Sequence, residues 1–470
     1  MATELKPYPA YKDSGLPWLG SVPENWQLRR TKTILRERSE KGFPDEPLLA
    51  ATQTKGVVRK EDYENRTVLA LKDLQLLKLV RIGDFVISLR SFQGGIEYAR
   101  DQGIISPAYT ILYLVKQEDH AYLAWLFKSA SYVQNLTLYV TGIRQGQNID
   151  YEKLSRSDLP IASKRDRAAI VQYLDHADRK VRHAIRARQQ LIKLLTEQKQ
   201  AIIQRAVTRG LDPDVRLKPS GVPWLGDVPE HWQMRRLKYL LREVDERSET
   251  GQERLLAVSQ YTGVTPRGAL RGQGEAITRA RSLVGYKRVQ LGDLVVNIML
   301  AWNGSLGVAA SDGIVSPAYC VYQFHDGLDA RYFAALLHTP PCQARIKTAS
   351  TGVIESRLRL YSDDLGRIEV PIPPVEEQSA IVQYLDVATA NLDKAIDAAR
   401  REIDLLREYR TRLIADVVTG KLDVRDAATY LPDEPEEQPE LLDEEPVAET
   451  SDLDTEESDG DQSEDESRDA

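Results

Sequence analysis

The chain contains an internal duplication, and this feature constrains its fold more than any other. Residues 14–32 read SGLPWLGSVPENWQLRRTK and residues 220–238 read SGVPWLGDVPEHWQMRRLK, so 14 of 19 positions are identical at an offset of 206. Further matches follow in the same order at offsets of 210 to 211, pairing GIISPAYTILYL from Gly103 with GIVSPAYCVYQF from Gly313 and AIVQYLD from Ala169 with AIVQYLD from Ala380. Two copies of about 210 residues are too few and too long for a solenoid, so we expect tandem domains.

Each copy has two unlike halves. The first carries short β-branched and aromatic runs separated by Gly, Pro and Asn, which is typical of strands and turns. Residues 120–136 and 330–346 have helical patterns, although Pro340 and Pro341 must interrupt the second of these segments. The first half of each copy is therefore expected to be a mixed α/β domain.

The second half of each copy is a long helix with a heptad pattern. The apolar stripe could be buried against its own domain, but two stripes of equal length and register favour mutual pairing in a coiled coil. Lys199 and Arg410 occupy the same position in the two stripes, where they either extend outward to solvent or determine the register. The predicted contact positions are Val181, Ile185, Arg188, Ile192, Leu195, Lys199, Ile202 and Ala206, and Leu392, Ile396, Ala399, Ile403, Leu406, Arg410, Leu413 and Val417.

These patterns predict an α+β or mixed fold with two α/β domains joined by two long helices that form an antiparallel coiled coil. The predicted boundaries are 1–163 and 213–375 for the domains, 164–212 and 376–430 for the helices, and 431–470 for a disordered acidic tail.

Charge is distributed unevenly along the chain. The sequence holds 63 Lys and Arg against 71 Asp and Glu, but residues 431–470 contain 19 of the acidic residues and one basic residue. The first 430 residues therefore carry about +10, a balance that favours a nucleic-acid partner. No apolar run approaches the roughly 18 residues of a membrane span, and two cysteines indicate reduced thiols, so we expect a cytoplasmic protein without a membrane partner.

Motifs for catalysis are missing from the sequence. It contains no GxxxxGK[ST], no GxGxxG in a strand-to-helix context, no HExxH and no Asn-Pro-Pro-aromatic tetrad. The six histidines and two cysteines lack metal-ligand spacing. We therefore expect no catalytic residues, no metal and no cofactor on this chain.

The same residues resemble the specificity subunit of type I restriction-modification systems. The resemblance rests on PWLGxVPxxWxxRR at Pro17 and Pro223, GIxSPAY at Gly103 and Gly313, and VPIPPVEEQSAIVQYLD from Val370, and it covers about residues 8–430. It implies two target recognition domains that each read one half of a bipartite sequence in double-stranded DNA. It also implies that the paired helices space the half-sites and dock two modification subunits, which bind S-adenosylmethionine and methylate adenine. Restriction subunits can join such complexes.

The first copy departs from this pattern where its helix begins. PIASKRDR replaces PIPPVEEQ, so Arg165, Asp166 and Arg167 stand where the second copy has Glu376, Glu377 and Gln378. Ser163 and Asp166 can cap the helix, but equal docking of a partner at both junctions is left open.

Loops at which the two copies differ are the candidates for reading different half-sites. Arg, Lys, Gln and Asn on such loops suit the edges of guanine and adenine, although phosphate contact and plain solvation are the alternatives for any one of them. Trp302 could equally be a core residue. The candidates are Lys55, Arg59, Lys60, Arg90, Gln93, Arg144, Gln145, Gln147 and Asn148 in the first domain, and Arg267, Arg271, Gln273, Trp302, Asn303, Ser305, Arg357 and Arg359 in the second.

Other interpretations are kept open. Trp18, Trp26, Trp224 and Trp232 are alike in both copies, which favours packing over base stacking. A duplicated adaptor that binds proteins is the main rival function, and a self-contained nuclease is disfavoured because no cluster of metal-binding carboxylates is evident. The acidic tail either keeps a basic body in solution or acts as a weak DNA mimic.

Overall fold

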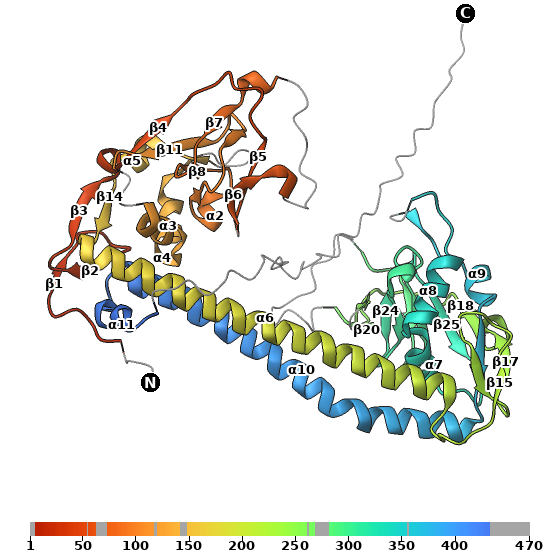
Figure 1. The fold of residues 1–470 in the computed structure, drawn as a ribbon. Helices are drawn as coiled ribbons and strands as arrows, with labels where there is room; N and C mark the ends of the chain where they lie inside the picture. The colour runs from red at the N-terminus through yellow and green to blue at the C-terminus, as the bar shows by residue number, and fades with distance from the viewer. Residues whose placement is uncertain are drawn as a thin grey trace, which may run out of the picture. The chain divides into compact units, whose positions relative to one another are not determined.

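The computed structural model describes residues 5–53, 55–62, 73–116, 120–141, 148–260, 263–267, 282–354 and 357–432. These residues form two compact units, the first built from residues up to 176 and from 416 onward, the second from residues 177–415 (Figure 1). The acidic tail beyond residue 432 lies outside the described residues.

Unit 1 contains a four-stranded antiparallel sheet with the order β4-β11-β8-β9, accompanied by five two-stranded antiparallel pairs. The pairs are β1-β2, β3-β14, β5-β6, β7-β10 and β12-β13. The strands are β1 (Tyr11–Asp13), β2 (Ser21–Pro23), β3 (Gln27–Arg30), β4 (Leu35–Arg38), β5 (Leu49–Thr52), β6 (Gly56–Arg59), β7 (Lys78–Val80), β8 (Phe85–Ile87), β9 (Glu97–Tyr98), β10 (Gly103–Ile105), β11 (Thr110–Leu114), β12 (Val140–Thr141), β13 (Asn148–Ile149) and β14 (Asp158–Ile161). The short helices are α1 (Thr31–Ile34), α2 (Ser91–Gly94), α3 (His120–Lys128), α4 (Ala130–Leu136), α5 (Tyr151–Ser155) and α11 (Arg425–Thr429).

Unit 2 repeats this frame with a sheet of the corresponding order, β18-β25-β22-β23. Its strands are β15 (Leu217–Pro219), β16 (Asp227–Pro229), β17 (Gln233–Arg236), β18 (Leu241–Val244), β19 (Leu256–Ser259), β20 (Gly263–Pro266), β21 (Lys287–Val289), β22 (Leu294–Val296), β23 (Leu306–Val308), β24 (Gly313–Val315), β25 (Cys320–Phe324) and β26 (Glu369–Ile372). Its short helices are α7 (Ala330–Leu337), α8 (Pro340–Ala349) and α9 (Ser362–Gly366). The prolines interrupt the second helical segment as predicted, and the first segment is also interrupted, between α3 and α4.

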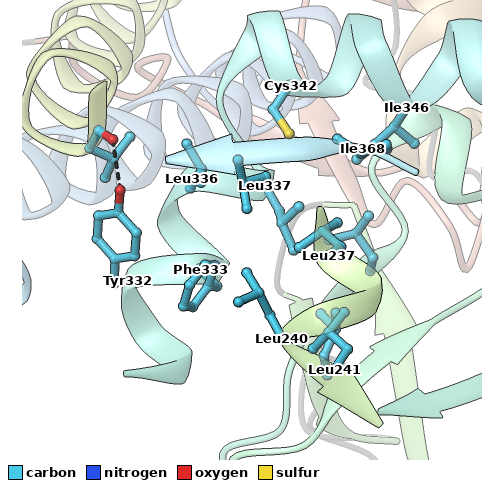
Figure 2. Packing of buried hydrophobic residues seen from close by; sticks show 14 of the residues in the cluster. Leu237, Leu240, Leu241, Tyr332, Phe333, Leu336, Leu337, Cys342, Ile346 and Ile368 are labelled. Carbon is cyan, nitrogen blue, oxygen red and sulfur yellow. Dashed lines mark hydrogen bonds between the residues drawn. The ribbon is translucent and has the colours of Figure 1, made fainter. Parts of the chain in front are cut away.

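The core of unit 2 lies between its sheet and these helices. Figure 2 shows Phe333, Leu336 and Leu337 of α7 facing Leu237 and Leu240, all of them buried. The repeated tryptophans belong to the cores as well, since Trp26 and Trp232 are 0% exposed. The interpretation as packing residues is therefore confirmed for Trp26 and Trp232, while Trp18, edge-on to Tyr132, and Trp224 are partly buried.

Two long helices complete the molecule, α6 (Lys164–Arg209) and α10 (Val375–Val418). Within unit 2 they run antiparallel, because Lys199 pairs with Asp393 and Arg410 pairs with Asp178. Val181, Ile185 and Ile403 form a buried cluster between them. The predicted fold class is thus confirmed, with the paired helices visible side by side in Figure 1.

The polar positions in the helix pair make ion pairs rather than extending freely to solvent. Lys199 Nζ lies 2.6 Å from Asp393 Oδ1, and Arg410 Nε lies 2.5 Å from Asp178 Oδ1. Arg188 pairs with Glu402 in the same way. These contacts favour the hypothesis that the two basic residues determine register.

Near the start of each long helix, a carboxylate accepts a hydrogen bond from the indole of a core tryptophan. Trp26 Nε1 donates to Asp166 Oδ2 at 3.0 Å, and Trp232 Nε1 donates to Glu377 Oε2 at 3.0 Å. Ser163 caps α6 as predicted, since its Oγ accepts from the amide of Asp166 at 3.2 Å. The two junctions thus differ in sequence but keep the same carboxylate contact.

Each helix also ends in the unit formed mainly by the other copy of the repeat. Tyr122 Oη donates to the carbonyls of Pro160 and Val418 in unit 1, at 3.0 and 3.2 Å. Tyr332 Oη donates to the carbonyls of Val207 and Pro371 in unit 2, at 3.0 and 3.3 Å; Figure 2 draws a hydrogen bond from this hydroxyl as a dashed line. The two copies of the repeat therefore exchange helix ends: α10 ends in unit 1, and α6 ends in unit 2.

Candidate nucleic-acid interface

In unit 1 the turn between β5 and β6 lies directly against α2. Lys128 Nζ donates to the carbonyls of Gln53 at 3.1 Å and Gly94 at 2.8 Å. A Cβ at Gly94 would lie 2.7 Å from Gln53 Cγ, so the two segments are in contact. Strand β13 also packs beside α2. The described parts of the three loops selected in the first domain therefore converge.

The candidates of unit 1 differ in what they already bind. Arg90 and Gln93 are exposed on α2 and at its start. Arg59 is half exposed and lies within 3.5 to 3.8 Å of Glu61 and Asp101. Asn148 Oδ1 accepts from the amide of Ile149 at 2.9 Å. Lys55 and Lys60 flank the converging turn and strand, both half-buried, while Arg144, Gln145 and Gln147 lie outside the described residues.

The corresponding segments of unit 2 also come together. A Cβ at Gly304 would lie 3.5 Å from Gln260 Cβ, which places the end of β19 beside the loop after β22. The amide of Leu360 donates to the carbonyl of Ile298 at 2.9 Å, which adds the segment from Thr351 to Arg359. The convergence therefore occurs twice, on equivalent parts of the two frames.

Trp302 and Asn303 sit at the centre of this region. Trp302 Nε1 donates to the carbonyl of Met299 at 3.0 Å, and Lys347 Nζ lies 5.3 Å from the centre of its ring. Asn303 Oδ1 accepts from Ser305 Oγ at 2.9 Å. Ser305 itself is 4% exposed, so its placement does not fit the expected base contact and instead holds Asn303.

The arginines of unit 2 lie at the edge of the same region. Arg357 is exposed, and Arg359 is half-buried with its Nη1 donating to the carbonyl of Leu358 at 2.9 Å. Arg267 follows β20 directly, while Arg271 and Gln273 lie outside the described residues.

Lys128 and Lys347 are two central cations that the sequence comparison did not select. Both lie on helices that resemble each other in the two copies, so a comparison of loops passes over them. A difference between the two copies could have identified them, because at an offset of 210 Lys128 aligns with His338 and Lys347 aligns with Thr137.

The described part of the chain offers neither a metal site nor a membrane span. No group of three or more His, Cys, Asp or Glu side chains is placed to hold a metal ion among these residues. Over the same residues, no helix combines the length and the apolar character needed to cross a membrane.

Comparison with known proteins agrees with the resemblance found in the motifs. No family model matches the chain. A type I restriction enzyme MjaX specificity subunit from Methanocaldococcus jannaschii is 19% identical over 443 residues, which cover 87% of this chain and 96% of the relative. The chain is thus similar, over nearly its whole length, to a specificity subunit.

One solved structure shares the fold. It is described as the structural basis underlying complex assembly and conformational transition of the type I R-M system, has a TM-score of 0.58 at 18% identity, and covers 85% of this chain and 99% of its own. The HsdS subunit from Thermoanaerobacter tengcongensis has a TM-score of 0.42 at 16% identity, covering 87% of this chain and 100% of its own.

Proposed function

We propose that the chain is the DNA sequence-recognition subunit of a type I restriction-modification complex, and that each unit reads one half of a bipartite target. The observation that carries the proposal is the convergence, in both units, of the loops at which the two copies differ. Two readers of different half-sites need a shared frame with divergent loops, and the similarity to a specificity subunit supports this assignment.

The chemistry of the converging loops suits duplex DNA. Arginine and lysine side chains can bind the O6 and N7 atoms of guanine, and glutamine and asparagine can bind N6 and N7 of adenine. The same cations can neutralise phosphates and so set the orientation of each unit on the duplex. Trp302, with Lys347 over its ring, adds a partly exposed aromatic surface to these loops in unit 2.

The paired helices have a separate role in this proposal. They fix the gap between the half-sites and dock two modification subunits, which bind S-adenosylmethionine and methylate adenine. Restriction subunits would add cleavage to the same assembly. The chain itself contributes recognition and scaffolding and binds no cofactor.

Duplex binding by the chain together with its modification subunit tests the proposal. Affinity should fall steeply with salt, with a log–log slope of about −0.9 for each phosphate neutralised. Lys55→Ala in unit 1 and Arg357→Ala in unit 2 should each either lower the slope by about 1 or cost about 1–3 kcal/mol at a single base position. Lys32→Ala, which removes an exposed lysine on α1 away from these loops, should change neither quantity.

Two results would count against the assignment. Failure to bind any duplex with the modification subunit present would favour the protein-binding adaptor. Methyl transfer from S-adenosylmethionine by the purified chain alone would contradict a non-catalytic subunit.

A further inference from the structure

The ammonium group of Lys128 joins three segments of unit 1. It lies 2.6 Å from Glu97 Oε1 on β9, 2.8 Å from the carbonyl of Gly94 at the end of α2, and 3.1 Å from the carbonyl of Gln53 in the turn after β5. A lysine ammonium has three donors, so these contacts use all of them. Two of the three segments carry candidate DNA-reading residues.

The packing around this ammonium leaves little freedom. A Cβ at Gly94 would lie 2.7 Å from Gln53 Cγ, and a Cβ at Gly95 would lie 2.3 Å from the carbonyl oxygen of Phe127. Gly95 also has a φ of +85°, which favours glycine. The distance between the turn and α2 therefore depends on the contacts of Lys128 and on Gly94 and Gly95, where there is no room for a side chain.

Stability alone gives a weak reason for this ion pair. Glu97 is 2% exposed, and its second oxygen, Oε2, has no hydrogen-bond partner among the residues that the structure describes. Burying an incompletely paired carboxylate is costly, and apolar replacements of buried ion pairs are often neutral or stabilising. A role in holding a specific geometry fits these observations better.

Unit 2 has no equivalent pair at these positions. The strand register matches Val86 with Glu97 in unit 1 and Val295 with Gly307 in unit 2, so glycine replaces the carboxylate. Lys128 corresponds to His338, whose Nδ1 lies 2.8 Å from the carbonyl of Ala334 in its own helix. The two units thus use different means to hold their loops.

We propose that Lys128 and Glu97 are positioning residues that set the spacing between the β5–β6 turn and α2, and thereby determine the base preference of unit 1 alone. The inference rests on the proposed function, since it concerns how one of the two half-sites is read. Neither side chain is assigned a contact with DNA. Their effect passes through Gln53 and Gly94 to the candidates beside them.

Protonation provides a way to test the pair. Burial raises the pKa of Glu97 to about 7, against a lowering influence from Lys128. Lys128 is the charged group that faces it from α3. Tyr98 follows it on β9, with Arg100 influencing Tyr98 and His120 stacked on the Tyr98 ring. As pH falls through about 7 the carboxylate takes up a proton, and the ion pair with Lys128 is lost.

The pH dependence of fold stability should run opposite to that of the ion pair. Because the folded pKa of Glu97 lies above the ordinary value of 4.5, its contribution to stability is complete below that value and is lost as pH rises to about 7. E97Q is therefore not expected to lower the melting temperature at pH 8.5. A loss of base preference without a loss of stability would distinguish positioning from a purely structural role.

The experiment selects duplexes from a randomised pool with the chain bound to its modification subunit, at pH 8.5 and pH 6. E97Q and K128M should relax preference in one half-site by about tenfold, the order of one base contact, and leave the other half unchanged. The wild-type protein should show the same one-sided relaxation at pH 6. K128R, which keeps the charge, should retain more preference than K128M, and H338A in unit 2 should leave both halves unchanged.

The outcomes separate the inference from the proposed function. A wild-type complex that selects no motif would overturn the proposed function, and the inference with it. Selection of a motif that E97Q and K128M leave intact, or relax equally in both halves, would overturn the inference alone.

Discussion

The two units share one frame, but the end of the long helix that each unit contains is connected to the rest of the unit in different ways. In unit 2 the end of α6 runs on through Gly210 into β15 without a break. In unit 1 the end of α10 meets the N-terminal segment, a separate part of the chain. There the amide of Asp423 donates to the carbonyl of Lys6 at 2.7 Å, and Tyr11 Oη donates to the carbonyl of Gly420 at 3.1 Å.

Hydrogen bonds and an aromatic contact stand in for the covalent link in unit 1, and a local ion pair orients Arg425 for that contact. Arg425 donates to both carboxylate oxygens of Asp423 at 2.6 to 3.1 Å and lies 5.0 Å from the centre of the Tyr8 ring. Burial alone would raise the pKa of Asp423, but hydrogen bonds from Arg425 hold it below its usual value. The difference shows that a duplicated frame tolerates a chain break where hydrogen bonds and the contact of Arg425 with the Tyr8 ring join the two segments.

The largest effect should come from removing this closure. Ending the chain at Gly420 removes Asp423 and Arg425 together with the buried Val424 and Ala428. Loss of buried side chains and of these hydrogen bonds should cost unit 1 about 3–5 kcal/mol, read as faster hydrogen exchange in its sheet by mass spectrometry. Exchange in the sheet of unit 2 should not change.

The matched control ends the chain at Pro432 and so removes only the acidic tail. It should leave exchange in both units unaltered. Equal acceleration in the two units after truncation at Gly420 would mean that closure is not specific to unit 1.

A smaller effect distinguishes the two equivalent basic positions in the helix pair. Asp178, the partner of Arg410, is 8% exposed, whereas the side chain of Asp393, the partner of Lys199, is 48% exposed. R410M should therefore cost about 1–2 kcal/mol, less than a fully isolated buried charge because Arg182 still pairs with Asp178 at 2.7 Å. K199M should change stability by less than about 0.5 kcal/mol.

Urea unfolding followed by helical circular dichroism measures both changes. D178N, which removes the shared partner, serves as the reference for R410M. Equal costs for R410M and K199M would show that burial of the acidic partner does not decide the strength of these pairs.

Much of the architecture could be predicted because the same sequence patterns occur in both copies of the repeat. Matching segments gave the two domains, and a shared heptad register gave the helix pair, since an apolar stripe of that length must be covered. The carboxylate contacts of Trp26 and Trp232 were harder to see, because one copy uses Asp166 and the other Glu377. The exchange of helix ends could not be predicted, since AVTRGLD and VVTGKLD suit either unit equally well.

The sequence predicted which loops form the candidate site, but not which side chains in it are exposed or which contacts hold the loops in place. Loop divergence found the segments that converge, but composition could not tell that Ser305 is buried. Nor could it find the contact between Lys128 and Glu97, which are 31 residues apart and lie on a helix and a strand. Such contacts depend on the packing of α3 against the sheet, which no local pattern specifies.

The central claim is that two units of one chain read two parts of one DNA sequence. Single-molecule methylation mapping of a genome that expresses the chain with its modification subunit tests this claim most directly. The account predicts adenine methylation within a motif of two short defined sequences separated by an unspecified gap of fixed length. Methylation at a single uninterrupted motif, or no methylation that depends on this chain, would contradict it.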